Sequence, residues 1–156
     1  MSRLAEQVAH ALSTEGPLAR HWPGFLPRSG QTDMAEAVTQ AVLDGGSLVV
    51  EAGTGVGKTF AYLVPVLLSG QRALVSTATK ALQDQLFARD LPRLAEVLNL
   101  PVRVALLKGR SSYLCIHRME QARHQPQAAQ PVWQRALSKV EQWAQFTRTG
   151  DMAELP

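Results

Sequence analysis

A glycine-rich segment that ends in a lysine and a threonine is the part of this sequence best suited to chemistry. It reads Glu51-Ala-Gly-Thr-Gly-Val-Gly-Lys-Thr59. Small residues let successive backbone N–H groups converge on phosphate oxygens, and the positive end of a following helix dipole favours the same anion. Lys58 supplies a cation for the β- and γ-phosphates, and the Thr59 hydroxyl supplies a ligand for Mg²⁺. The spacing therefore predicts a phosphate loop that binds a nucleoside triphosphate.

The sequence on either side of this loop supports the prediction. An apolar run at 47–50 precedes it and an apolar segment from Phe60 to Leu68 follows, which is the strand-loop-helix context of a phosphate loop. Ala52 replaces the first glycine of the usual pattern, and its methyl group is small enough to keep the turn. The residues predicted to hold the phosphates are Ala52, Gly53, Thr54, Gly55, Val56, Gly57, Lys58 and Thr59. The alternative is a glycine-rich turn that binds nothing.

Helices and buried strands alternate around the loop. Apolar residues at helical spacing predict helices over 2–14, 30–44, from Thr59 onward, 80–88 and 132–147, with a short helical piece between Pro92 and Pro101. Ser29 is expected to cap the second helix, Pro65 to kink or split the third near Val64, and 16–27 to form an irregular connector. Apolar runs at 47–50, 72–76 and 102–107 predict parallel strands. The fold class predicted is α/β with a doubly wound parallel sheet, whose ligand lies at the C-terminal edge of the strands.

The composition is that of an ordinary globular domain. The 156 residues are 46% hydrophobic and 19% charged. A formal charge of +3 is compatible with nucleic-acid binding without proving it. The apolar runs are far shorter than the roughly 20 residues that span a bilayer. A single cysteine, Cys115, excludes an intramolecular disulfide and fits a reducing interior.

Two further groups of residues suggest contacts with ligands. The Gln31 amide presents an acceptor and two donors, which match the edge of adenine and reject guanine, although a glutamine in a first helical turn can also be simply solvated. Thr77, Thr79 and Lys80 follow the second predicted strand, where hydroxyls and a cation suit the phosphates of a single strand. Thr79 also suits an N-cap, and the two roles are compatible.

The segment Lys108-Gly-Arg-Ser-Ser-Tyr-Leu-Cys115 is basic and polar. Composition alone favours Cys115 as a small buried hydrophobe. One thiolate cannot hold an iron–sulfur cluster, which takes four ligands, and Cys115 with His117 is too sparse for a zinc site.

Taken together, the motifs resemble those of superfamily 2 DNA helicases. Arg28, Gln31 and Met34 match the Q-motif, residues 51–59 match motif I, and Ser76-Thr-Ala-Thr79 with Leu82-Gln83 matches motif Ia, in the same order. The segment 108–115 resembles the XPD-like iron–sulfur helicases, specifically their bacterial DinG/YoaA branch, with Ser112 in place of the usual asparagine. Thr149-Gly150-Asp151 also resembles that branch, and the whole resemblance covers residues 24–156.

This resemblance implies an ATP-dependent 5′-to-3′ DNA helicase of repair and replication, in the bacterial cytoplasm at the nucleoid. Residues 1–107 would be the N-terminal part of a RecA-like P-loop domain, and residues 108–156 the beginning of a helical iron–sulfur domain. Arg28 and Gln31 would contact adenine, and Cys115 would be the first ligand of a [4Fe-4S] cluster. DNA contacts would come from Thr77, Thr79, Lys80 and Arg110. The implied cofactors are ATP, Mg²⁺ and the cluster; the implied partners are single-stranded or forked DNA and replication machinery such as the polymerase III chi subunit.

The acidic residues limit what the chain is expected to do alone. Such a helicase needs an Asp-Glu pair for Mg²⁺ and the attacking water, and after Asp90 no two acidic residues are adjacent. We therefore expect an N-terminal fragment, inactive by itself, without the second RecA-like domain and three further cysteines. The alternatives are another P-loop enzyme such as a small-molecule kinase or GTPase, a non-catalytic module that docks on replication proteins, and a regulator that sequesters ATP or DNA.

Overall fold

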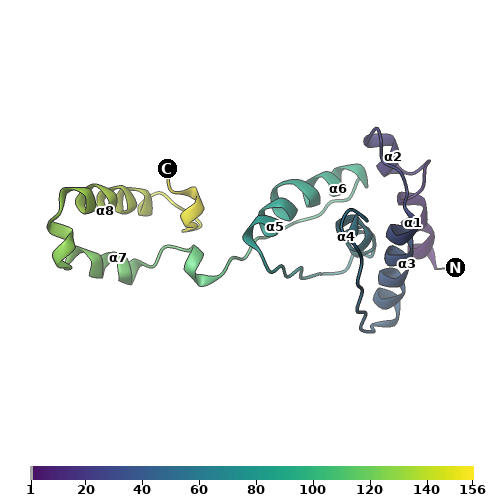
Figure 1. Ribbon diagram of the computed structural model, residues 1–156, viewed down its shortest axis with the longest axis horizontal. Coiled ribbons are helices and arrows are strands. Elements are labelled where there is room, and N and C mark those ends of the chain that lie inside the picture. Colours follow the sequence, from purple (N-terminus) through teal and green to yellow (C-terminus); the bar gives the residue numbers. More distant parts are fainter. Residues whose placement is uncertain (1) are drawn as a thin grey trace. The chain divides into compact units, whose positions relative to one another are not determined.

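The computed structural model describes residues 2–156, apart from the side chains of Gln127 and Ala128. It divides the chain into two compact units, of which the first ends at Ala105 and the second runs from Leu106 to Pro156 (Figure 1). The first unit contains α1 (Arg3–Ala11), α2 (Pro17–His21), α3 (Ser29–Asp44), α4 (Lys58–Leu68), α5 (Lys80–Gln85) and α6 (Leu91–Val97). The residues Leu86–Asp90 between α5 and α6 are π-helical, so helical backbone continues from 80 to 97.

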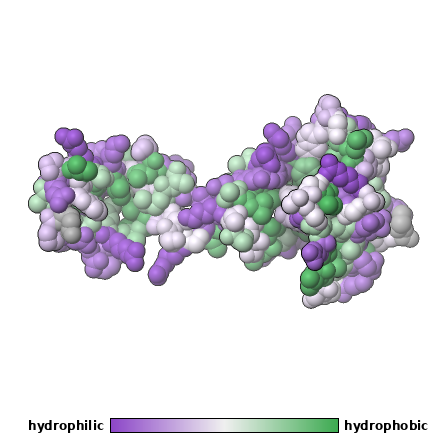
Figure 2. Space-filling view, in the orientation of Figure 1, coloured by the Kyte–Doolittle hydropathy of each residue, from purple (hydrophilic) through white to green (hydrophobic). Residues whose placement is uncertain are grey.

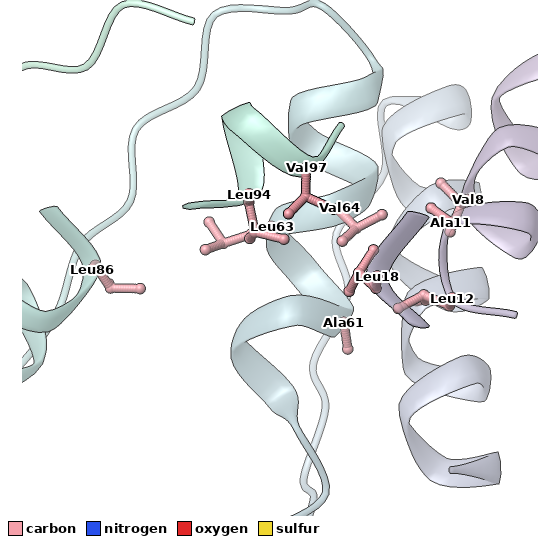
Figure 3. Close-up of a cluster of buried hydrophobic side chains, with 11 residues drawn as sticks. Val8, Ala11, Leu12, Leu18, Ala61, Leu63, Val64, Leu86, Leu94 and Val97 are labelled. Atoms are coloured by element: carbon pink, nitrogen blue, oxygen red, sulfur yellow. The ribbon is translucent and has the colours of Figure 1, made fainter. Parts of the chain in front are cut away.

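Apolar side chains from the helices of the first unit form its core. Leu63 and Val64 of α4 point toward Leu94 and Val97 of α6 (Figure 3). The same cluster includes Val8, Ala11 and Leu12 at α1, Leu18 of α2, Ala35 of α3, Ala61 of α4 and Leu86. Burial of one such large side chain is worth roughly 1.5–3 kcal/mol, so this cluster fixes how α3 and α4 pack together beneath the phosphate loop.

The predicted parallel sheet is not present among residues 2–156. The segments 47–50, 72–76 and 102–107 have no regular secondary structure, and β-pairing in the described part of the chain is limited to one antiparallel bridge between Tyr113 and Asp151. Val49 is 98% exposed and Leu74 is 93% exposed, whereas strands buried on both faces would hide them. A strand needs a neighbour for its N–H and C=O groups, and no backbone bond joins these three segments to one another within residues 2–156.

Several helix boundaries also differ from the predictions. Arg28, rather than Ser29, is the N-cap residue of α3. The helix α4 continues through Pro65 to Leu68 instead of splitting near Val64, because one lost backbone hydrogen bond is offset by burial of the side chains around it. The connector at 16–27 contains α2, which begins at Pro17, a residue whose fixed φ suits a first helical turn.

The second unit contains α7 (Ile116–Arg123), which the sequence did not predict, and α8 (Pro131–Ala144). Short 3₁₀ turns lie at Arg110–Ser112, Pro126–Ala129 and Met152–Glu154. Lys108 forms an ion pair with Asp151, with 2.7 Å between Nζ and Oδ2, and the Leu114 N–H donates to the Gly150 carbonyl at 2.8 Å. Polar contacts thus join the first and last segments of this unit.

Apolar residues lie at the surface of both units (Figure 2). No helix within residues 2–156 is both long enough and apolar enough to cross a membrane.

Candidate nucleotide site

The loop at 51–57 and the first turn of α4 form the centre of the candidate site. Gly55 and Gly57 have φ angles of 81° and 87°, in the left-handed region that favours glycine. Gly57 is the N-cap of α4, so the helix begins at Lys58. The first N–H groups of a helix have no intrahelical acceptor, which leaves those of Lys58 and Thr59 available to an anion. The predicted phosphate loop is therefore followed directly by the helix N-terminus it requires.

Lys58 lies across its own loop. Its Nζ donates to the carbonyls of Ala52 at 2.7 Å and Gly53 at 2.6 Å. An ammonium group has three N–H donors, and the third has no printed protein acceptor within residues 2–156. The side chain is thus held at the loop by two bonds while one donor remains for a phosphate oxygen, which fits the role predicted for Lys58.

The amide of Gln31 is bound to the phosphate loop. Gln31 is 4% exposed, and its Nε2 donates to the Gly57 carbonyl at 3.0 Å. Gly57 admits this contact because a Cβ atom there would overlap the Gln31 amide nitrogen. The amide therefore joins α3 to the start of α4 in this structure, a contact that the sequence did not predict. Arg28 is exposed at the N-cap of α3, where its carbonyl accepts from the Thr32 hydroxyl at 3.3 Å.

Two aromatic rings pack beside the same turn. Trp22 and Phe60 stack with their centroids 5.1 Å apart and their planes 16° from parallel. Phe60 directly follows Thr59, so the stack holds the connector before α3 against the first turn of α4. Trp22 was expected to pack as a cover, and this contact confirms it.

Thr59 contacts a tyrosine one turn further along α4. Its hydroxyl hydrogen-bonds to the Tyr62 phenol. Burial raises the pKa of Tyr62, the bond from Thr59 lowers it, and the negative charge of Asp90 raises it. The sequence analysis missed both Tyr62 and Asp90. The i, i+3 spacing of Thr59 and Tyr62 on a helix was the signal that could have found the first contact.

The residues predicted to contact DNA form a small turn before α5. The Thr77 hydroxyl donates to the Thr79 carbonyl at 3.2 Å, and the Thr79 hydroxyl accepts from the Leu82 N–H at 3.3 Å. Thr79 is thus an N-cap, as the alternative interpretation held. Thr79 and Lys80 are also exposed, so the predicted contact with phosphates remains compatible with the cap.

Arg110 and Cys115 both lie in the second unit. Both are exposed, and Cys115 is the N-cap residue of α7. The expectation from composition that Cys115 is a buried hydrophobe is therefore wrong. Within residues 2–156 no group of three or more His, Cys, Asp or Glu side chains is placed to hold a metal ion. These residues do not hold an iron–sulfur cluster by themselves.

Comparison with known proteins assigns the chain to a family. Residues 32–141 match the DEAD/DEAH box helicase family. The chain belongs to that family. This assignment supports a P-loop helicase fold for the matched residues, which include the phosphate loop and α4.

Individual relatives agree with the family. The chain is 47% identical over 148 residues to the ATP-dependent DNA helicase YoaA of Haemophilus influenzae, a match that covers 95% of this chain and 23% of the relative. It is 57% identical over 107 residues to the YoaA helicase of Escherichia coli, covering 69% and 17%. It is 35% identical over 147 residues to a Bacillus subtilis protein named 3′-5′ exonuclease DinG, covering 90% and 16%. The predicted resemblance to the DinG/YoaA branch is confirmed, and the chain spans under a quarter of the length of these relatives.

Proposed function

We propose that this chain supplies the ATP-binding part of a DNA helicase that couples ATP hydrolysis to movement along single-stranded DNA. The observation that carries the proposal is the placement of Lys58 across a glycine-rich loop that ends at the N-terminus of α4. The names of the YoaA relatives support ATP and DNA as its ligands. A kinase or a GTPase is disfavoured because the family match lies with helicases.

Each residue of the loop would have a separate task. The N–H groups of the loop and of the α4 terminus would bind phosphate oxygens, and the Lys58 ammonium would offset charge on the β- and γ-phosphates. The Thr59 hydroxyl would bind Mg²⁺, which neutralises charge that develops during phosphoryl transfer. Gln31, with Arg28 beside it, would contact adenine once its amide exchanges the Gly57 carbonyl for the base, or through the lone pairs of its oxygen.

We further propose that 47–50, 72–76 and 102–107 become parallel strands in the full-length helicase. Their apolar side chains are exposed here, and strands of this composition are stable when covered on both faces. Residues 1–107 would then be the first part of a RecA-like domain. In that sheet the turn at Thr77, Thr79 and Lys80 would follow the C-terminal end of a strand, the edge at which ligands of such folds bind.

The second unit would contribute Arg110 to DNA binding and Cys115 to the cluster domain at 108–156. A [4Fe-4S] cluster takes four thiolates, and this sequence has one cysteine, so three ligands would have to come from elsewhere. The cluster, the nucleoid location and the polymerase III chi subunit as a partner stay predictions from the resemblance.

The test compares the wild-type full-length helicase with a Lys58→Ala variant. Loss of the cation should lower kcat/KM for ATP by about 10²–10³-fold, as for removal of one electrostatic donor from a transition state. Unwinding of forked DNA should fall with it. The matched control is Lys139→Ala, which removes an exposed lysine of α8 and should leave both activities unchanged.

A Lys58→Ala variant as active as the wild type would contradict the proposal. Nucleotide competition refines it: ATP should bind more tightly than GTP to the wild type, and Gln31→Ala should narrow that difference. Binding to a replication protein that is unaffected by Lys58→Ala, without hydrolysis in the wild type, would favour a non-catalytic module instead.

A further inference from the structure

Asp90 is a buried charged residue for which the proposed site has no role. It is 5% exposed, and it is the one ionisable side chain classed as buried within residues 2–156. Burial of a carboxylate costs free energy unless hydrogen bonds or charges compensate. It lies at the end of the π-helical stretch Leu86–Asp90, and π-helical turns often mark functional sites. Its neighbours therefore deserve a functional explanation.

Two of these neighbours lie on the same helical run. Gln85 Nε2 donates to Asp90 Oδ2 at 2.8 Å, and Arg89 Nε donates to Asp90 Oδ1 at 2.9 Å. Gln85 is the last residue of α5, the helix that begins immediately after Thr79. The carboxylate is thereby fixed to the helix whose N-terminus carries the predicted DNA contacts.

The third neighbour lies on the nucleotide-binding helix. The charge of Asp90 acts on the Tyr62 phenol, to which the Thr59 hydroxyl is hydrogen-bonded. The adjacent residue Leu63 packs toward Leu94 of α6, so the helical run that carries Asp90 lies against α4 (Figure 3). The side chains of Thr59, Tyr62 and Asp90 thus form a polar row between the phosphate-loop helix and the run that starts at Lys80.

The hydroxyl of Tyr62 is the central part of this row. Its ring alone would satisfy packing beside Leu63, as a phenylalanine would. A partly buried phenol usually has a polar partner, and here it is placed between a residue predicted to bind Mg²⁺ and a buried carboxylate.

We propose that Asp90 and Tyr62 couple contact with single-stranded DNA at Thr79 and Lys80 to the orientation of the Thr59 hydroxyl. The inference rests on the proposed function. A DNA strand that shifts α5 would move Asp90 with it, and Tyr62 would pass the change to Thr59. Because such coupling is reciprocal for binding, bound nucleotide would change the affinity for DNA by the same factor. Both residues are positioning residues, since neither touches the reacting atoms.

The experiment measures ATP hydrolysis by the full-length helicase with and without single-stranded DNA. The quantity compared is the stimulation ratio, the rate with DNA divided by the rate without it. Tyr62→Phe and Asp90→Asn should each lower this ratio about tenfold, which corresponds to roughly 1.4 kcal/mol of coupling. The double variant should lower it no further than either single variant, because both changes interrupt one row. The matched control, Asp44→Asn at the exposed end of α3, should keep the wild-type ratio.

An unchanged ratio in Tyr62→Phe, or single effects that multiply in the double variant, would overturn the inference. Tyr62→Phe removes one oxygen atom and keeps the ring, so it answers the question even where Asp90→Asn does not fold. A lower melting temperature with an unchanged ratio would show a purely structural role and also overturn it. Full hydrolysis by Lys58→Ala would instead refute the proposed function, so the two failures are distinguishable.

Discussion

The two units of the chain are held together by different forces. In the first, apolar side chains of α1, α2, α3, α4 and α6 form a shared core. In the second, Ser112 is the one residue classed as buried among those whose burial is described, and apolar side chains such as Val132 and Phe146 are 76% and 80% exposed. Its segments are joined by the Lys108–Asp151 and Arg123–Glu141 ion pairs and by backbone bonds.

This difference indicates where each unit depends on its surroundings. Core burial is insensitive to salt, whereas ion pairs weaken as ionic strength rises. A unit that leaves large apolar side chains exposed also has surface available for further contacts. The first unit should therefore keep its helices under conditions in which the second loosens.

The largest expected effect is the loss of a core side chain in the first unit. Leu63→Ala should destabilise that unit by about 2–5 kcal/mol, because Leu63 is fully buried and its removal leaves a cavity. Hydrogen exchange measured by mass spectrometry would show faster exchange in peptides from α3 and α4. The matched change Val132→Ala in the second unit should alter exchange little, since Val132 is largely exposed. Equal effects of the two changes would show that the units do not differ as described.

A smaller effect is expected from the ion pair that joins the ends of the second unit. The side chains of Lys108 and Asp151 are 10% and 13% exposed, so Asp151→Asn leaves a poorly solvated ammonium and should cost about 1–3 kcal/mol. Exchange should rise in peptides from 106–115 and 149–156 while α4 stays protected. Glu120→Gln, at an exposed acid of α7, is the control. Protection that is unchanged in Asp151→Asn would mean that other contacts close this unit.

The smallest expected effect is a pH dependence confined to the first unit. Burial, the largest cause, raises the pKa of Tyr62 above its ordinary value. A raised pKa in the folded state means that stability is fully present below the unfolded value near pH 10 and is lost as the pH rises through the folded value. Stability of the wild type should therefore fall above about pH 10, and Tyr62→Phe should fall less steeply. Identical alkaline slopes in urea unfolding of the two proteins would contradict this prediction.

The features that the sequence predicted correctly are those encoded locally. The phosphate loop depends on glycines, a lysine and the start of a helix within nine residues, and all of these are found at 51–59. The N-cap at Thr79 follows from its hydroxyl and the helix after it. The resemblance to DNA helicases also rested on short motifs and is confirmed by the family match.

The features that were missed depend on residues distant in the sequence. The apolar runs at 47–50 and 72–76 indicate burial, but a strand exists only beside another strand, and neither run has one within residues 2–156. The bond from Gln31 to Gly57 spans 26 positions, and Asp90 meets Tyr62 through packing of separate helices. No local pattern shows which of two helices will face a given side chain.

The contact between Gln31 and Gly57 has a consequence for how this sequence can vary. The amide of one residue occupies the space that a side chain at the other would need, so the two positions share a single volume. A variant that gains a Cβ at 57 must displace the glutamine, in addition to straining a backbone with φ of 87°. Homologues that lack glycine at 57 should consequently also have lost the glutamine at 31, which makes the two positions a covarying pair although they lie in different motifs.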